Sequence, residues 1–187
     1  EMSASLVGSE MCIRDSRWGR VIVTLDAHKD MAMPPLPRLG IMLPVERSMR
    51  HVTYYGYGPD ESYIDKREHC YVDMFQAEVE DLHENYIRPQ ENGSHYHCRY
   101  VSLENEKYRL LAEADNYLDF NVSDYTVEEL AGKRHNFELE PASGSLLSLD
   151  ARMMGIGSNS CGPDLPEEFL RDEAHTVWKV QLQIEEL

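Results

Sequence analysis

The stretch HYHCRYVSLENEKYRLLAEADNYLDFNVSD, residues 95–124, carries three strand patterns in succession. Each pattern is a short run rich in β-branched and aromatic residues, in which apolar and polar side chains tend to alternate, as is typical of a half-buried β-strand. Turn signals rich in proline and glycine separate many such runs along the chain. We expect eight strands, at residues 20–28, 38–45, 50–58, 95–104, 108–115, 117–124, 144–155 and 175–184.

One helix is predicted near residues 126–132, where TVEELAG carries a capping pattern from Thr126 to Glu129 and ends on glycine. Eight strands at roughly even spacing and one short helix indicate an all-β fold, a large antiparallel two-sheet β-sandwich. The sequence shows no internal repeat, low-complexity tract or linker.

The first sixteen residues stand apart from this pattern. Their run LVGSEMCIRDS, residues 6–16, resembles the translation of a sequencing adapter, and it lacks the apolar core and cleavage site of a targeting signal. We interpret residues 1–16 as adapter-derived or non-native, and we expect them to make no consistent core contacts. Residues 17–187 are expected to form part of one domain whose N-terminal portion lies upstream.

The composition argues against several classes of partner. The chain has 34 acidic and 18 basic residues, a formal net charge of −16, and no Lys/Arg stripe, so neither nucleic acid nor an anionic membrane surface is expected to bind. No apolar run approaches the roughly 18 residues of a membrane helix. Outside residues 1–16 the cysteines are Cys70, Cys98 and Cys161, an odd number without a C-x-x-C pair. Such cysteine usage favours a reducing compartment, and we predict a cytoplasmic protein.

The run MMGIGSNSCGP, residues 153–163, leaves a predicted strand through small residues, and three interpretations compete for it. A phosphate-binding loop is disfavoured, because Pro163 stands where the lysine is required and removes a backbone donor. A nucleophilic Cys161 would need a histidine base, and the sequence does not show whether His135 or His175 lies near it. The third interpretation is a rigid loop that reaches beyond its own domain.

Two other pairs of residues have spacings that suit a site. His95 and His97 are two apart on a predicted strand, so we expect them to share one face, as metal ligands can, although a solvated face is the commoner meaning. Glu61 and Glu91 both lie in loops, and a retaining glycosidase needs two carboxyl groups about 5 Å apart. We favour a simpler role for these two glutamates, in which they hold tight turns.

Four motifs carry a family resemblance. They occur in the order and spacing of the C-terminal domain of large bacterial β-galactosidases, in glycoside hydrolase family 2: YYGYGPDESYIDK (54–66), YIRPQENGSHYHCRYVSL (86–103), LDFNVSDYTVEEL (118–130) and LLSLDARMMGIGSNSCGP (146–163). The chain resembles this family from about Gly19 to its end. In the family the domain is a large galactose-mutarotase-like β-sandwich, called the small chain when separately encoded. Because the complete domain is longer at its N-terminal side, the resemblance implies that residues 17–187 are its C-terminal part.

The resemblance also implies a role for the loop at residues 153–163. In the family this loop reaches the mouth of an active site that an upstream (β/α)₈ barrel builds. The matching positions imply substrate contacts for Cys161, Asn159 and Ser160, and loop-shaping roles for Gly155, Gly157 and Pro163. Well-known relatives carry a tryptophan at the position of Cys161, so this sequence departs from them, as does a branch of the family with the same SNSCGP run.

The implied activity is retaining hydrolysis of terminal non-reducing β-D-galactosides such as lactose. The resemblance places both catalytic glutamates in the upstream barrel, together with the magnesium and sodium ligands. We therefore expect no catalytic residue, metal or cofactor in this chain, no activity of the chain alone, and a barrel domain or large subunit as its partner. The full-length enzyme is expected to be a homo-oligomer. The alternative is a separately encoded, non-catalytic sandwich that binds carbohydrate or assembles subunits.

Overall fold

The computed structural model describes residues 6–15, 19–157, 162–170 and 172–187, and within residues 6–15 Met11 is the one side chain that it describes. In these described ranges, two short α-helices, α1 (Val127–Gly132) and α2 (Glu167–Leu170), and two 3₁₀ turns, Val79–Leu82 and Asn136–Glu138, accompany the strands. The strands are β1 (Leu6–Asp15), β2 (Arg20–Lys29), β3 (Arg38–Val45), β4 (His51–Gly58), β5 (Tyr71–Glu78), β6 (Ser94–Glu104), β7 (Tyr108–Ser123), β8 (Ser145–Met153) and β9 (His175–Glu186).

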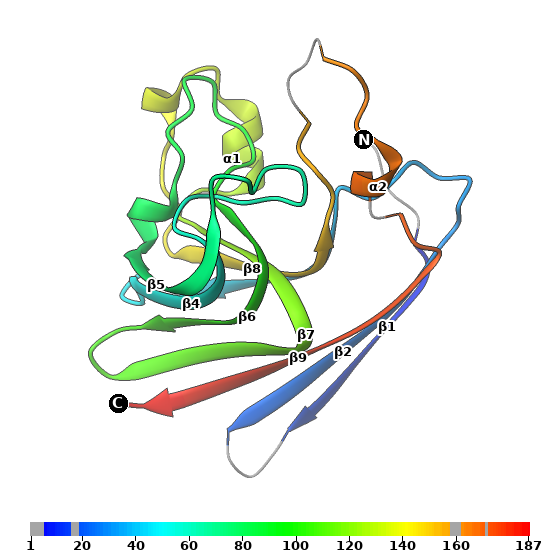
Figure 1. The fold of residues 1–187 in the computed structure, drawn as a ribbon. Coiled ribbons are helices and arrows are strands. Elements are labelled where there is room, and N and C mark those ends of the chain that lie inside the picture. Colours follow the sequence, from blue (N-terminus) through cyan, green and yellow to red (C-terminus); the bar gives the residue numbers. More distant parts are fainter. Residues whose placement is uncertain (1–5, 16–18, 158–161, 171) are drawn as a thin grey trace.

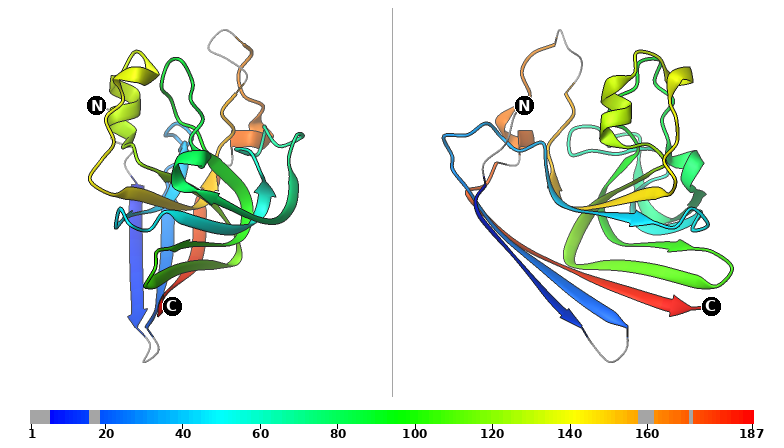
Figure 2. Two further views of the ribbon diagram at one scale, coloured as in Figure 1. Left: turned by 90° about the vertical axis from the view of Figure 1, so that its left-hand side faces the viewer. Right: turned by 180° about the vertical axis from the view of Figure 1, so that it is seen from behind.

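All strand pairs are antiparallel, and their main order is β1-β2-β9-β7-β6-β4-β5, with β8 joining β7 to β3. Strand β7 is 16 residues long and belongs to both layers. Its first part, residues 108–114, pairs with β9, and its last part, residues 119–123, pairs with β8. Figures 1 and 2 show the β1-β2-β9 layer diverging from the layer that contains β3 and β8. The predicted all-β sandwich is thus confirmed.

Among the side chains that the structure describes, one hydrophobic cluster fills the space between the strands. On β2 the side chains alternate, so that Val23, Leu25 and Ala27 are buried and the residues between them face outward. The cluster's largest fully buried side chains outside β2 come from four strands, and they are Tyr54, Phe120, Leu103, Leu118, Leu147 and Leu149. This burial explains the alternating pattern that is read from the sequence.

The strand predictions were largely confirmed, except at β7, at β5 and at β1. The runs 108–115 and 117–124 form the single strand β7. Strand β5 was not predicted, because most of its residues are exposed at the sheet edge and leave no buried period in the sequence. Helix α1 was predicted correctly, and the Thr126 hydroxyl accepts the Glu129 N–H at 3.0 Å, whereas the single turn α2 was missed.

Strand β1 was also not among the predicted strands, and it lies within residues 1–16, which were predicted to make no consistent core contacts. Residues 6–15 pair with β2 from Leu6 to Asp15 and form the edge of the sheet. Backbone hydrogen bonds hold an edge strand of this kind, and almost any sequence without proline can supply them. The domain boundary after residue 16 stays a prediction.

The sandwich presents helix α1 and the loop after β8 at the same end of the molecule, the upper end in Figure 1. The loop between β4 and β5 and the segment 83–93 approach them there, because side chains from all four regions line one pocket. Among the described residues no helix has the length and apolar character required to cross a membrane. The place where these four segments meet is the candidate site.

Candidate functional site

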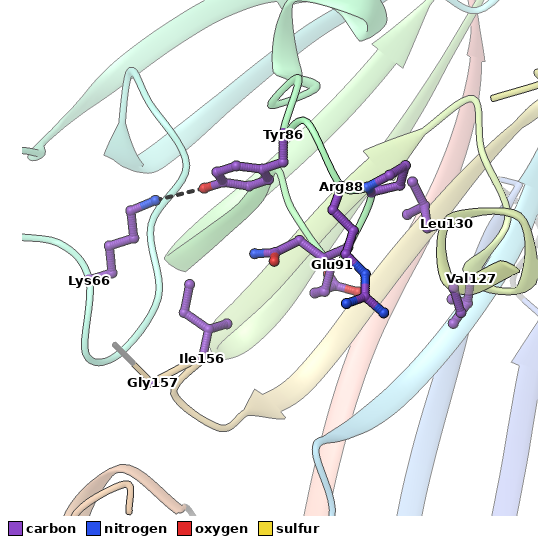
Figure 3. A pocket seen from close by; sticks show the side chains of 11 residues that line it. Lys66, Tyr86, Arg88, Glu91, Val127, Leu130, Ile156 and Gly157 are labelled. Carbon is purple, nitrogen blue, oxygen red and sulfur yellow. Dashed lines mark hydrogen bonds between the residues drawn. The ribbon is translucent and has the colours of Figure 1, made fainter. Parts of the chain in front are cut away.

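An open pocket of about 870 Å³ lies where these four segments meet. Figure 3 shows Lys66 and Tyr86 on one side, Ile156 and Gly157 below them, and Val127 and Leu130 of α1 opposite. The lining residues are Lys66, Tyr86, Arg88, Pro89, Gln90, Glu91, Val127, Leu130, Ala131, Ile156 and Gly157. The pocket thus combines an apolar helix face with several charged and hydrogen-bonding groups.

A buried carboxylate, Glu61, organises the wall that carries Lys66 and Tyr86. Its side chain is 3% exposed, and it accepts hydrogen bonds from Lys66 Nζ, from the Tyr86 hydroxyl and, at 2.7 Å, from the Gly93 N–H. Lys66 Nζ also donates to the Tyr86 hydroxyl at 3.0 Å, and Tyr63 donates to the carboxylate at 3.3 Å. Every oxygen of Glu61 is therefore engaged by donors of the protein itself.

The electrostatics of Glu61 follow from these contacts. Burial alone would raise the pKa of its carboxyl group, but the hydrogen bonds from Lys66, Tyr86 and Gly93 outweigh burial and lower the pKa. The same contacts raise the pKa of Lys66 against the opposing effect of burial. Glu61 is thus held as an anion, which suits a structural anchor and does not suit a general acid.

The second carboxylate, Glu91, lines the pocket and has a different environment. Its Oε2 lies 3.4 Å from Arg38 Nη1, while its buried Oε1 has no hydrogen-bond partner among the described residues. Burial raises the pKa of Glu91, and the positive charge of Arg38 opposes this shift in part. Arg38 is itself held by Asp150 on β8, at 2.5 Å from Nη2 to Oδ2. The contact between Glu91 and Arg38 thus connects the pocket to β3, and the pair between Arg38 and Asp150 connects β3 to β8.

The loop after β8 is anchored by Asp65. One carboxylate oxygen accepts the Ile156 N–H at 3.1 Å and the other accepts the Gly157 N–H at 2.9 Å. Gly157 has a φ of +75°, which favours glycine, and a Cβ at Gly155 would lie 2.6 Å from Cγ of Asp65. The close approach of Asp65 to the backbone fixes the first residues of the loop at the rim of the pocket.

The base of the same loop is held by a backbone hydrogen bond, and a small hollow lies beside it. The Gly155 N–H donates to the carbonyl of Phe169 at 2.9 Å. Pro163 and Gly157 line one hollow of about 190 Å³ beside Asp65 and Phe169. The predicted substrate contacts Asn159, Ser160 and Cys161 lie outside the described residues, so their roles stay predictions.

The metal hypothesis for His95 and His97 is not supported by their positions. We expected the two side chains to share one face, but the register of β6 shifts between His95 and Cys98, and His97 has a φ of +59°. This bulge re-aims the side chains. His95 is buried against Tyr54 and Phe120, whereas His97 stacks on Tyr117 with ring centroids 3.6 Å apart.

Glu61 and Glu91, which were predicted to hold tight turns, differ in their contacts. Glu61 acts as the turn-holding group that we favoured, since it binds the backbone of Gly93 from the neighbouring loop. Sequence reasoning missed Asp65, Lys66 and Tyr86 as parts of a site. The motifs YYGYGPDESYIDK and YIRPQENG contain all three, but only the fold brings these distant segments together.

Comparison with known proteins adds independent information. The sequence model of a family described as "Beta galactosidase small chain" matches residues 12–183. A β-galactosidase of Actinobacillus pleuropneumoniae is 40% identical over 151 residues, which are 81% of this chain and 15% of that protein. A β-galactosidase of Staphylococcus xylosus is 38% identical over 167 residues, which are 89% of this chain and 17% of that protein.

A third relative, a β-galactosidase of Arthrobacter sp. (strain B7), is 34% identical over 170 residues, which are 87% of this chain and 16% of that protein. The chain thus spans between 15% and 17% of the length of these three relatives.

Proposed function

Because the chain belongs to the β-galactosidase small chain family, we propose that it serves as the C-terminal part of the small-chain domain in a retaining β-galactosidase. The substrates of the complete enzyme are terminal non-reducing β-D-galactosides such as lactose. In this proposal the present chain supplies a loop to the mouth of the active site and provides structural support for that site. The chain alone is inactive, because both catalytic glutamates belong to the absent upstream barrel.

The observation that carries this proposal is the hold of Asp65 on the loop after β8. Two backbone N–H groups of the loop donate to one carboxylate, and the base of the loop is closed at Phe169. A loop that enters a neighbouring active site has to be positioned within a fraction of an ångström, and such anchoring supports that role. Asn159, Ser160 and Cys161 follow directly in the chain, and we propose that they contact the leaving-group sugar.

The pocket residues do not favour catalysis within this chain. In a retaining glycosidase one carboxylic acid protonates the leaving-group oxygen while a carboxylate attacks the anomeric carbon. Glu61 is occupied by Lys66, Tyr86, Tyr63 and Gly93, so it is not free to attack a sugar. Positively charged partners on both carboxylates, Lys66 on Glu61 and Arg38 on Glu91, also make a poor magnesium or sodium site.

The proposed setting of the complete enzyme has three parts. The partner of this domain is a (β/α)₈ barrel, in the same polypeptide or in a large subunit. The assembled enzyme is a homo-oligomer. Its location is the cytoplasm, where a reducing environment matches the free thiols of Cys70 and Cys98.

Replacing Asp65 by alanine in a full-length enzyme that contains this domain tests the anchor. Both loop N–H groups lose their acceptor, so we expect kcat/KM for lactose to fall by roughly tenfold, because small misplacements of positioning groups are costly. Steady-state kinetics with lactose provide the measurement. The control is Glu68→Ala, since Glu68 is an exposed residue of the same connection between β4 and β5. Equal kinetics for both variants would contradict the proposed role of the loop.

Two substitutions at Cys161 test the proposed sugar contact in the same enzyme. An aromatic ring that stacks on the leaving group adds on the order of 0.5 to 1.5 kcal/mol beyond its area burial. We therefore expect Cys161→Trp to bind glucose as an acceptor roughly fivefold more tightly and to raise transglycosylation relative to hydrolysis. Cys161→Ser should leave turnover of an aryl galactoside within a few fold. A loss of several orders of magnitude in the serine variant would instead identify Cys161 as a nucleophile.

A further inference from the structure

Three side chains far from the pocket form a compact polar cluster on the outer face of the sheet. Asp26 and His28 lie two residues apart on β2, and both point away from the core because Ala27 between them is buried. His175, the first residue of β9, lies directly opposite His28 in the antiparallel register. Strand pairing thus brings together two residues near the start of the chain and one near its end.

The distances within this cluster are short. Nε2 of His175 lies 2.8 Å from Oδ1 of Asp26, and Nε2 of His28 lies 3.4 Å from the same oxygen. The two imidazole rings are stacked, with centroids 4.1 Å apart and planes inclined by 5°. One potential ligand atom from each residue lies within 4.8 Å of the others.

These distances resemble those between neighbouring ligands of one metal ion. Two donor atoms bound to a tetrahedral zinc ion at about 2.0 to 2.1 Å lie about 3.3 Å from each other. The 3.4 Å separation of His28 and Asp26 is near that value, whereas the 2.8 Å contact of His175 with Asp26 is a shorter hydrogen bond that both groups would exchange for the ion. The stacked rings need a modest rotation to aim both lone pairs at one point, and the side chains are free to make it, since His28 and His175 are 59% and 49% exposed.

We propose that Asp26, His28 and His175 bind a divalent transition metal ion of the zinc class, with water completing a tetrahedral site. Two imidazoles and one carboxylate suit zinc, cobalt, nickel or copper, whereas magnesium and calcium prefer sites built from oxygen alone. Among the residues that the structure describes, this is the one cluster of histidine, cysteine and carboxylate side chains compact enough to hold such an ion.

The ion would strengthen the contact between β2 and the start of β9. It joins β2 to the first residue of β9, where the chain returns from the loop that follows β8. The adjacent Lys29 already fastens this return: its Nζ lies 2.7 Å from Asp172, and its N–H donates to the carbonyl of Ala174 at 2.8 Å. The metal ion is thus a second link between β2 and the start of β9, in addition to the contacts of Lys29. The proposed metal site does not depend on the proposed enzyme activity.

The test uses the full 187-residue chain without a histidine tag, treated with a chelator and then titrated with zinc chloride by calorimetry. We expect one zinc ion per chain, and a rise in melting temperature on zinc addition, because an ion that binds the folded state stabilises it. His28→Gln and His175→Gln should each weaken zinc binding by at least about tenfold, since even the loss of groups that support metal ligands costs 10- to 100-fold in affinity.

The matched control is His51→Gln. His51 also faces a carboxylate across two strands, with Nδ1 3.1 Å from Oε1 of Glu78 on β5, but among the described residues this pair has no third potential ligand close enough to share an ion. The control should keep the full affinity and the zinc-dependent rise in melting temperature. The melting temperature of each metal-free variant shows that it is folded. The proposal is overturned if His28→Gln and His175→Gln bind zinc as tightly as the unchanged chain, or if the control loses as much affinity as they do.

Discussion

Replacing Gly40 with alanine is expected to destabilise the domain by about 3 kcal/mol, the upper part of the range for overpacked interiors. Gly40 lies on β3 opposite Asp150 of β8, where the register of this strand pair shifts. A Cβ at Gly40 would lie 2.2 Å from the carbonyl oxygen of Leu149 and 2.6 Å from Cα of Asp150. Both are backbone atoms, so the two strands would have to separate, and the Asp150 partner of Arg38 would move with them.

Gly132→Ala is the matched control, and both variants are compared with the unchanged chain by urea unfolding. Gly132 is the last residue of α1, and a Cβ there would meet nothing within 4 Å. Alanine at such a position should be neutral or stabilising by roughly 0.5 to 1 kcal/mol. A loss below about 1 kcal/mol in Gly40→Ala would show that β3 does not approach β8 as closely as described.

The stability of the domain should fall between pH 6.5 and pH 4 because of His95. This side chain is 1% exposed between the rings of Tyr54 and Phe120, and burial lowers its pKa to about 4 in the folded state. The unfolded chain has an ordinary histidine pKa of about 6.5 and so binds the proton more readily. The contribution of neutral His95 is therefore complete above pH 6.5 and is lost as the pH falls toward 4, by roughly 3 kcal/mol in all.

Urea unfolding at pH 7.5 and pH 4.5 of the unchanged chain and of His95→Leu measures this effect. Because leucine does not titrate, the unchanged chain should lose about 2 to 3 kcal/mol more than the variant between the two pH values. His69→Gln, a change at an exposed histidine, should retain the full pH dependence. If His95→Leu and the unchanged chain lost stability in parallel, another titrating group would carry the effect.

The strand pattern of the domain could largely be read from local sequence. The run at residues 20–28 was predicted as a strand, and in β2 Val23, Leu25 and Ala27 are buried on one face, as an alternating pattern requires. The helix signal at Thr126 was equally local, since a capping hydroxyl reaches a backbone N–H three residues away. Such features depend on spacing within a few residues, and spacing is a property of the sequence itself.

The same local reasoning failed where the backbone departs from a regular strand. An even alternation would have put His95 and His97 on one face, but the bulge in β6 separated them, one into the core and one onto Tyr117. Strand β5 was missed for a related reason, because its backbone pairs with β4 while most of its side chains remain exposed. Both features are decided by packing against other strands and not by the residues of the strand alone.

The sequence by itself thus determined the class of fold and the position of the loop after β8. Its motifs also indicated the family to which the chain belongs. Only the tertiary structure decided which distant groups meet: Asp65 with the backbone of Gly157, Glu61 with Gly93, and His28 with His175. A strand pattern specifies which side chains share a face, but it does not specify the neighbouring strand or its register. Those follow from the joint packing of the whole core, in which residues more than a hundred positions apart lie side by side.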